Sequence, residues 1–380
     1  MSEQSPNNGG LTWPRSDLID LLGITHPIIQ APMASASTPD MAAAVCNVGG
    51  LGSLGCAMYD TEGVRKVVAD LRHQTDRPFN LNFFVHQEPD LTAADTEPMR
   101  ALLAPYYAER GAETVPEVRV PFPTFGEAML ETLLELRPPI VSFHFGLPSS
   151  AAITALKAAG VILMGSATTV PEANALADGG VDAIVAQGHE AGGHRGTFAE
   201  PFEDGLVGTM ALVPQIVDAV EVPVIAAGGI ADGRGIAAAF MLGASGVQIG
   251  TAYLTCPESA ADEIYRAVLR KGRGDQTRVT RLFTGRPARS LRNRLIDELA
   301  DHEKDAAPFP SQTSLTAPLR KAAARDNATE LRSLWSGQAV ALNRAMPAAE
   351  LTLTLVEEAQ ACLDRHAIRT GPFSPGVGTA

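Results

Sequence analysis

The sequence alternates short apolar runs with longer stretches in which apolar residues recur at helical spacing. Stretches 38–49, 61–72, 149–160 and 232–243 are amphipathic and begin at Thr, Ser or Asp, which are favourable first residues for a helix. The apolar runs end in Gly, Pro, Asn or Ser, as buried strands do. They are residues 24–32, 49–55, 79–85, 139–146, 161–167, 183–189, 222–229 and 246–254. This alternation predicts a parallel sheet covered by helices.

Eight such units over roughly 230 residues fit the length of a closed barrel better than an open doubly wound sheet. We therefore predict an α/β fold with a TIM (β/α)8 barrel over residues 18–254. Segment 87–137 is too long and too rich in Pro and acidic residues for a simple connection, which indicates an excursion on the barrel rim. A basic, helix-prone stretch begins near residue 270. It predicts a smaller C-terminal helical lid domain over 255–365, followed by a flexible tail over 366–380.

Composition and charge narrow the function classes. The chain is 45% hydrophobic and 19% charged, as soluble globular proteins are. Its net charge of −13 repels nucleic acid and anionic lipid, so neither is an expected partner, and a bound phosphate would need local backbone N–H groups. Four scattered cysteines form no C-x-x-C pair, which argues against zinc sites and disulfide frameworks. Neither a membrane span nor a secretion signal is apparent, so we expect a cytoplasmic enzyme.

Polar side chains lie at the predicted ends of several strands. In a TIM barrel the C-terminal ends of the strands meet at one face, where ligands bind. Amide side chains there can surround a planar heterocycle and offer it donors and acceptors without adding charge. These strand-end residues are Gln30, Asn80, Asn82, Ser142, His144, Gln187 and Gln248.

Two glycine-containing segments predict a phosphate site. Gly228 and Gly229 follow the seventh predicted strand, and Gly250 with Thr251 follows the eighth. Their N–H groups would point to the place where TIM barrels commonly bind phosphate. Either pair alone can equally make a tight strand-to-helix turn. Their joint occurrence favours phosphate.

The segment AQGHEAGGHRG (186–196) holds the candidate catalytic residue. His194 follows Gly192 and Gly193, so its ring can be held over a ligand on a backbone that approaches closely. Imidazole titrates near neutral pH, which makes His194 a candidate base. The alternative is a structural histidine.

The same segment contains a superficial metal motif. His189, Glu190 and His194 have a spacing that differs from the i,i+4 pattern of zinc helices, and the intervening glycines disfavour a helix. We therefore predict no metal, and expect Glu190 to accept hydrogen bonds from loop N–H groups. His144 can line the site or lie in the barrel core.

Seven motifs together resemble the nitronate monooxygenase family, once called 2-nitropropane dioxygenase, and its class I members in particular. They occur in family order, and the resemblance spans roughly residues 20–345. Several are shared with FMN-dependent enoyl reductases. The motifs are PIIQAPMA (27–34), NLNFF (80–84), VSFHFG (141–146), GSATTVPEA (165–173), AQGHEAGGHRG (186–196), AAGGIADGRG (226–235) and GVQIGTAYL (246–254).

The resemblance implies non-covalent FMN over the barrel mouth and a lid that completes the substrate pocket. His194 matches the family's catalytic base, and His144 and Phe309 are the expected substrate-pocket residues. The implied chemistry passes electrons from a nitronate to FMN and then to O2, giving a carbonyl compound and nitrite. Together with the strand-end amides and glycines, the expected cofactor-binding residues are Ala31, Pro32, Met33, Asn82, Gln187, Gly192, Gly193, Gly228, Gly229, Gln248, Gly250 and Thr251.

One departure from the family and two rival functions remain open. Phe309 in AAPFPSQTSL (306–315) stands where family members often have tyrosine, which leaves substrate preference less constrained. The rivals are an FMN-dependent NAD(P)H enoyl-thioester reductase and a non-catalytic flavin- or phosphate-binding barrel. Expected partners are O2 and a small nitronate, such as propionate 3-nitronate, or a nitroalkane. A homodimer is an open option.

Overall fold

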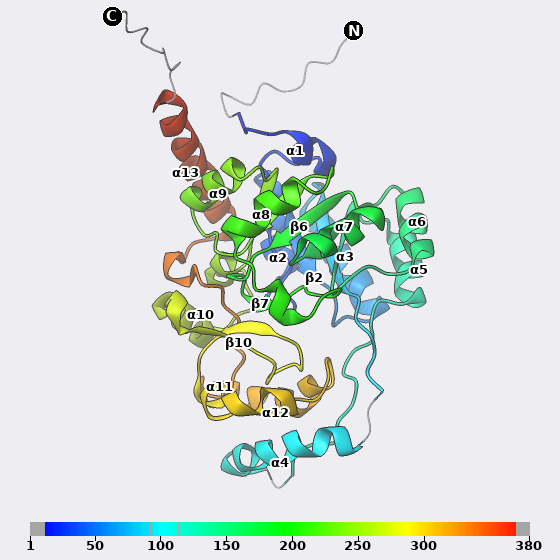
Figure 1. The fold of residues 1–380 in the computed structure, drawn as a ribbon, viewed down its shortest axis with the longest axis vertical. Helices are drawn as coiled ribbons and strands as arrows, with labels where there is room; N and C mark the ends of the chain where they lie inside the picture. The colour runs from blue at the N-terminus through cyan, green and yellow to red at the C-terminus, as the bar shows by residue number, and fades with distance from the viewer. Residues whose placement is uncertain (1–11, 91–92, 113, 370–380) are drawn as a thin grey trace, which may run out of the picture.

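Eight parallel strands form a barrel in the computed structural model, which describes residues 12–90, 93–112 and 114–369 (Figure 1). Their order is β1-β9-β8-β6-β5-β4-β3-β2, and a bridge between Ile29 and Leu51 closes the ring. Each strand lies inside one of the eight predicted runs, so the predicted TIM barrel is confirmed. The strands are β1 Ile28–Gln30, β2 Gly52–Gly55, β3 Phe79–Phe84, β4 Ile140–His144, β5 Ile162–Ala167, β6 Ala183–Gln187, β8 Val224–Ala227 and β9 Gly246–Ile249.

Helices cover the outside of the barrel, and most begin where the sequence placed a capping residue. The side chain of Thr38 accepts a hydrogen bond from the N–H of Met41, and Asp232 accepts from two N–H groups of its helix. The helices before the lid are α1 Asp17–Leu22, α2 Pro39–Asn47, α3 Thr61–Gln74, α4 Ala93–Glu109, α5 Glu127–Leu136, α6 Ser150–Ala158, α7 Val170–Asp178, α8 Thr209–Val217 and α9 Gly233–Met241. No helix of the described residues is apolar and long enough for a membrane crossing.

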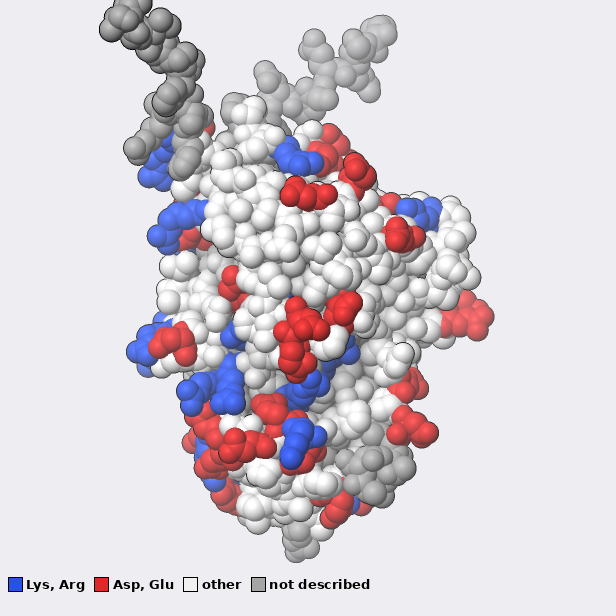
Figure 2. All heavy atoms as spheres, in the orientation of Figure 1, with Lys and Arg blue, Asp and Glu red and all other residues white. Residues whose placement is uncertain are grey.

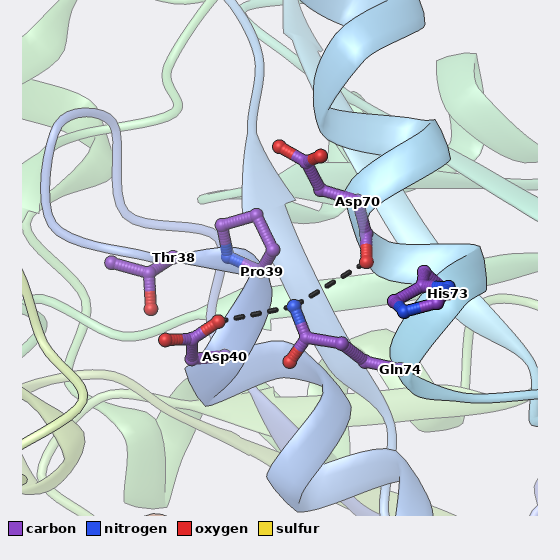
Figure 3. Close-up of a pocket in the computed structure, with 6 residues that line it drawn as sticks. All are labelled: Thr38, Pro39, Asp40, Asp70, His73 and Gln74. Carbon is purple, nitrogen blue, oxygen red and sulfur yellow. Dashed lines mark hydrogen bonds between the residues drawn. The ribbon is translucent and has the colours of Figure 1, made fainter.

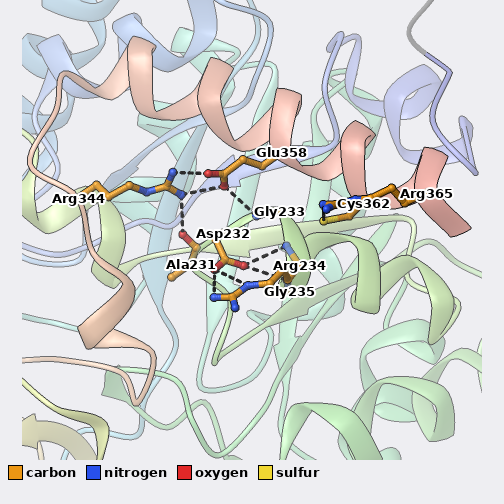
Figure 4. Close-up of polar contacts among 9 residues, drawn as sticks. All are labelled: Ala231, Asp232, Gly233, Arg234, Gly235, Arg344, Glu358, Cys362 and Arg365. Atoms are coloured by element: carbon orange, nitrogen blue, oxygen red, sulfur yellow. Dashed lines mark hydrogen bonds and ion pairs between the residues drawn. The ribbon is translucent and has the colours of Figure 1, made fainter.

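The last helix, α13 (Ala348–Arg369), packs against α9 and α2, in the position of the eighth barrel helix. Figure 4 shows how its Glu358 reaches the first turn of α9, where it accepts from the N–H of Gly233 at 3.2 Å. Arg344 holds the same carboxylate through two bonds of 2.6 and 3.0 Å. A Cβ on Gly233 would lie 2.3 Å from the backbone of Glu358, so only glycine permits this contact.

The lid contains a small antiparallel sheet that the sequence did not predict. Its order is β10 (Thr277–Thr280), β11 (Ala288–Leu291) and β7 (Gly193–His194). The expectation that stretch 270–295 is helix-prone was therefore wrong there. The stretch forms strands because β11 pairs with both β10 and β7, and β7 comes from the segment after β6.

The remaining lid elements come from two parts of the chain. Helix α4, in the predicted rim excursion, contacts the lid, and Oη of Tyr107 donates to the carbonyl of Leu315 at 2.7 Å. The barrel and lid ranges 18–254 and 255–365 stay predictions, although the packing of α13 argues for ending the lid before residue 348. Tail residues 370–380 lie outside the described residues. The lid helices are α10 Glu263–Lys271, α11 Arg294–Glu298 and α12 Gln312–Arg325, with 3-10 turns at Thr251–Thr255, Gly274–Gln276, Ala300–Asp305 and Val340–Leu342.

Candidate active site

His194 lies over the C-terminal ends of two barrel strands, where its backbone is held by their last side chains. Its carbonyl oxygen accepts hydrogen bonds from Nε2 of Gln187 at 2.9 Å and from Nε2 of His144 at 3.3 Å. Gln187 ends β6 and His144 ends β4. Oε1 of Gln187 also accepts from the N–H of Gly196 at 2.8 Å. Gln187 and His144 therefore position the segment that carries His194.

The ring of His194 is fixed by a residue of the lid. Its Nε2 lies 3.0 Å from Oγ1 of Thr284, and the Thr284 hydroxyl donates to the carbonyl of Arg286 at 3.3 Å. In the arrangement in which the Thr284 hydroxyl donates to Arg286, Nε2 of His194 carries the proton and donates it to Oγ1. Nδ1 then keeps its lone pair. It makes no hydrogen bond within the described part of the chain and is not enclosed, so it is the nitrogen that can accept a proton.

Burial and neighbouring positive charge keep this ring neutral. Burial is the main cause that lowers the pKa of His194 to about 3, and His144, Arg286 and Arg320 contribute to the same shift. Burial likewise lowers the pKa of His144 to about 3, with Arg286 adding to it. Both imidazoles are therefore uncharged at pH 7. A neutral ring beside guanidinium groups favours an anionic ligand over a cationic one.

Aromatic side chains surround the ring of His194. The ring centroids of Phe309, Phe84, Phe145 and Trp335 lie 5.6, 5.9, 5.9 and 5.5 Å from that of His194. The structure thus brings Phe309 and His194 together from distant parts of the chain. Whether Phe309 contacts substrate stays a prediction.

The predicted phosphate-binding groups gather at one end of the barrel. Gly228 and Gly229 follow β8, and Gly250 and Thr251 follow β9, which is the neighbouring strand. Within the described residues, the N–H groups of these four donate no hydrogen bond. Gly228 and Gly229 have φ of +106° and +73°, so both positions need glycine. Free N–H groups in this arrangement suit a phosphate.

The loop after β1 lies beside the same glycines. A Cβ placed on Gly250 would lie 3.5 Å from Cβ of Ala31 and 3.9 Å from Sδ of Met33. Pro32 lies between these two residues in the chain. Gln248 pairs with Ile29 of β1, and its side chain makes no hydrogen bond to a described residue. These positions are compatible with the cofactor contacts that the sequence predicts.

Three other predicted cofactor-binding residues, Asn82, Gly192 and Gly193, differ in how much room they leave for a ligand. The amide nitrogen of Asn82 donates to Oγ and to the carbonyl of Ser142, at 2.9 and 3.2 Å, inside the barrel. A Cβ on Gly192 would lie 2.4 Å from the nitrogen of Gly337, so lid packing alone requires glycine at that position. Gly193 has φ +71°, and a Cβ there would meet no atom within 4 Å. Of these three, Gly193 leaves the most room for a ligand.

His189 and Glu190 of the apparent metal motif form hydrogen bonds with other residues of the chain. Glu190 accepts from the N–H of Thr209 at 3.0 and 2.9 Å, so it binds backbone N–H as predicted, but that of the first residue of α8 instead of a loop. Arg289 donates to the carbonyl of His189 at 2.9 and 3.1 Å, and so ties β11 of the lid to the loop after β6. Across residues 12–90, 93–112 and 114–369, no three His, Cys, Asp or Glu side chains are grouped to hold a metal.

The site also contains residues that sequence reasoning missed. Thr284 and Arg286 come from the basic stretch that was predicted only as part of a helical lid, and Trp335 lies in a loop that gave no signal. Arg286 places its guanidinium 3.9 Å above the ring of Phe145. The antiparallel pairing of β11 with β7 brings this part of the lid to His194, and a bridge between Ser290 and Trp335 holds Trp335 beside β11.

Positively charged side chains on the surface lie near the site around His194, and the surface hollow lies elsewhere. Figure 2 shows Lys and Arg side chains gathered at the level where the lid meets the barrel, although the whole chain is acidic. A separate surface hollow of about 360 Å³ lies between α2 and α3 (Figure 3) and shares no residue with the site around His194. Its lining residues are Thr38, Pro39, Asp40, Asp70, His73 and Gln74.

The polar groups described above lie at the C-terminal ends of the barrel strands, which is where TIM-barrel enzymes carry their active sites. The class of protein is therefore a TIM-barrel enzyme.

Comparison with known proteins identifies the family. The family model described as nitronate monooxygenase matches residues 15–358. A probable nitronate monooxygenase from Staphylococcus aureus strain Newman is 42% identical over 347 residues, which cover 91% of this chain and 98% of the relative. The chain therefore belongs to the nitronate monooxygenase family and is an oxidoreductase, which confirms the resemblance seen in the sequence.

Two solved structures are similar to this chain over almost its whole length. A nitroalkane oxidase from Streptomyces ansochromogenes has a TM-score of 0.84 at 40% identity, covering 93% of this chain and 100% of its own. FabK from Thermotoga maritima has a TM-score of 0.72 at 29% identity, covering 93% and 99%. The family and the first neighbour together support oxidation of nitronates or nitroalkanes.

Proposed function

We propose that this protein is an FMN-dependent nitronate monooxygenase, which oxidises alkyl nitronates such as propionate 3-nitronate with O2 to a carbonyl compound and nitrite. When bound, FMN would supply a two-electron acceptor that can pass electrons on to O2. The observation that carries the proposal is the placement of His194. Its accessible Nδ1 and its neutral ring lie at the barrel mouth, among aromatic side chains and close to Arg286.

The residues present fit a flavin mononucleotide. The unpaired N–H groups of Gly228, Gly229, Gly250 and Thr251 would hold its phosphate. The loop from Ala31 to Met33 and the free amide of Gln248 would contact the rest of the cofactor. These contacts need no metal and no basic side chain, which suits an acidic chain.

His194 and its neighbours favour a substrate that arrives as the nitronate. Such a substrate is already an anion, so no proton has to be removed, and Arg286 and Arg320 supply positive charge nearby. A neutral nitroalkane must first lose its α-proton, and Nδ1 of His194 is positioned to accept it. With a pKa of about 3, His194 is a weak base in the free protein. We therefore expect nitronates to react faster than their parent nitroalkanes.

The test mixes the purified yellow protein with propionate 3-nitronate without oxygen and follows the flavin absorbance. We expect the absorbance near 450 nm to be lost, and nitrite to be released with turnover when air is admitted. His194→Asn should lose about 100-fold in kcat/KM with nitroethane and much less with the nitronate, because only nitroethane needs a base.

A parallel mixture with NADPH tests the reductase, which the similarity to FabK keeps in view. Rapid reduction by NADPH with no response to the nitronate would replace the proposed function by a reductase. A colourless protein that binds no added FMN would remove the flavin proposal altogether.

A further inference from the structure

The lid segment 335–338 is bonded to two loops of the barrel mouth. The N–H of Gly337 donates to Oγ1 of Thr251, in the loop after β9, at 2.9 Å. The N–H of the next residue, Gln338, donates to the carbonyl of Glu190, in the loop after β6, at 2.9 Å. One short stretch of the lid therefore joins the predicted phosphate site to the loop that leads to the candidate base.

Close packing at Gly337 makes this double contact possible. A Cβ on Gly337 would lie 2.9 Å from the carbonyl oxygen of Glu190, 3.1 Å from the nitrogen of Gly192 and 3.3 Å from Oγ1 of Thr251. These distances are shorter than an ordinary van der Waals contact, so a side chain would push the lid away from the loops. Glycine at this position lets the lid backbone approach both loops at once.

The same segment carries one of the aromatic rings around His194. The ring centroid of Trp335 lies 5.5 Å from that of His194. The carbonyl of Trp335 accepts from Oη of Tyr265, a buried lid residue, at 2.6 Å. Because Trp335 and Gly337 are two residues apart, a shift of Gly337 away from Thr251 also moves the aromatic wall beside His194.

Thr251 uses both of its acceptor oxygens on the lid side and neither of its donors. Its carbonyl accepts from Nδ2 of Asn343 at 3.1 Å, and its Oγ1 accepts from Gly337. Its N–H and its hydroxyl proton donate to no residue that the structure describes. Both are suitable donors to a phosphate oxygen. A phosphate bound by Thr251 would thus be held by the same residue that holds the lid.

We infer that Thr251 couples occupation of the phosphate site to the placement of the lid segment 335–338 over His194. This inference rests on the proposed function, because the phosphate is that of FMN. A hydroxyl that donates to a phosphate becomes a stronger acceptor, since hydrogen bonds in a chain polarise one another. Phosphate binding therefore strengthens the bond from Gly337, and Thr251 acts as a positioning residue for Trp335. By linkage, a well-placed lid strengthens phosphate binding by the same factor.

The test compares the protein loaded with FMN and with riboflavin, which has the same ring system and no phosphate. Amide hydrogen exchange in peptides that cover residues 335–338, followed by mass spectrometry, measures the placement of the lid without turnover. In the wild type, exchange should be about tenfold slower with FMN than with riboflavin. Thr251→Val keeps the shape of the side chain and removes the hydroxyl, so this ratio should fall to about twofold or less. Thr251→Ser should restore it.

Gly337→Ala changes the lid side of the same contact. Its methyl group displaces the segment from Thr251 and leaves the N–H and the hydroxyl of Thr251 in place. Because the coupling is reciprocal, Gly337→Ala should raise the Kd of FMN by about tenfold and that of riboflavin by at most about twofold. If this variant does not fold, Asn343→Ala, which removes the bond to the Thr251 carbonyl, should show the same order with smaller changes.

Thr255→Val is the matched control. Thr255 lies in the same 3-10 turn, and its hydroxyl donates to the carbonyls of Ala252 and Arg344, both at 2.9 Å. Neither of these residues is a predicted phosphate ligand. The substitution therefore removes a threonine hydroxyl from the turn without touching the contact at Gly337. The ratio of exchange rates with FMN and riboflavin should stay as in the wild type.

Equal exchange with FMN and riboflavin in the wild type would overturn the inference, as would a ratio that Thr251→Val leaves unchanged. A protein that binds neither flavin would refute the proposed function instead. Inorganic phosphate then still tests the coupling on that protein. It should slow exchange at residues 335–338 in the wild type and not in Thr251→Val, and no slowing in the wild type would count against the coupling itself.

Discussion

At the scale of single residues, the protonation of His194 depends on one hydroxyl. When Thr284 donates to the carbonyl of Arg286, it accepts from Nε2 of His194. This arrangement leaves the lone pair on the accessible Nδ1, where a base is needed for nitroalkanes. A threonine of the lid thus selects the tautomer of a histidine supplied by the segment after β6.

Thr284→Val keeps the shape of the side chain and removes this acceptor. We expect kcat/KM to fall by about 30-fold with nitroethane and by about threefold with ethyl nitronate, because only nitroethane requires the base. Steady-state assays of both substrates measure the difference. Thr284→Ser should restore both values. Equal losses on the two substrates would show that Thr284 does not act through the tautomer of His194.

At the scale of elements, the helical layer outside the barrel depends on how α13 docks on α9. Gly233→Ala places a methyl group 2.3 to 2.4 Å from backbone atoms of Glu358 and Ala359, so α13 must move. We expect a loss of about 2 kcal/mol in the free energy of unfolding, measured from urea denaturation curves.

Gly235→Ala is the control in the same helical turn. Its new methyl group would meet only Ile230, at 3.3 to 3.6 Å, so the better helix propensity of alanine should leave stability unchanged or slightly higher. If Gly233→Ala were as stable as the wild type, the docking of α13 would be looser than these contacts indicate.

The elements also show why sequence reasoning found the barrel and missed the small sheet. Strands such as β6 are continuous apolar runs that end in glycine or polar residues, so each one is visible locally. Strand β7 has two residues and no periodicity, and β11 lies within the basic stretch that was interpreted as helix-prone. Their pairing joins segments far apart in the chain, and no local pattern reports such a contact.

The residues of the candidate site also fall into two groups: those that a local sequence pattern predicts and those that it does not. His194 and the glycines after β8 and β9 could be identified because glycine directly after a strand indicates a special backbone position. Arg286 and Trp335 could not, since each reaches His194 only through the fold of the lid. The use of Gln187 to hold the His194 carbonyl was also missed, because sequence reasoning assigned its amide to the cofactor.

At the scale of the whole molecule, an acidic chain places unpaired positive charge around its site. The net charge is −13, yet Arg195, Arg286, Arg289 and Arg320 form no ion pair with any acid that the structure describes. Arg195 instead donates to three carbonyl oxygens, two of them at the end of β6. This distribution attracts anions to the barrel mouth and keeps the neighbouring imidazoles neutral.

The buried neutral histidines predict how stability depends on pH. Burial is the main cause that lowers the pKa of His144 and His194 to about 3, and of His86 and His189 to about 4. In the unfolded chain these groups titrate near 6.5, so between pH 6.5 and about 4 the unfolded chain binds more protons than the folded one. Stability is therefore complete above pH 6.5 and is lost as the pH falls below it.

His144 and His194 each contribute a slope of about 1.4 kcal/mol per pH unit and His86 and His189 less, because solvent screens them, so the four together should give about 3 to 4 kcal/mol per pH unit near pH 5.5. Urea denaturation at pH 7.0, 6.0 and 5.0 measures this slope. His189→Gln should reduce it by less than a quarter, and substitution of the exposed His73 by Gln should leave it unchanged. Carboxylates such as Asp232, whose pKa is lowered by Arg234, add their loss only below about pH 4. A slope below about 1 kcal/mol per pH unit in this window would mean that the histidines become solvated and protonated while the barrel stays folded.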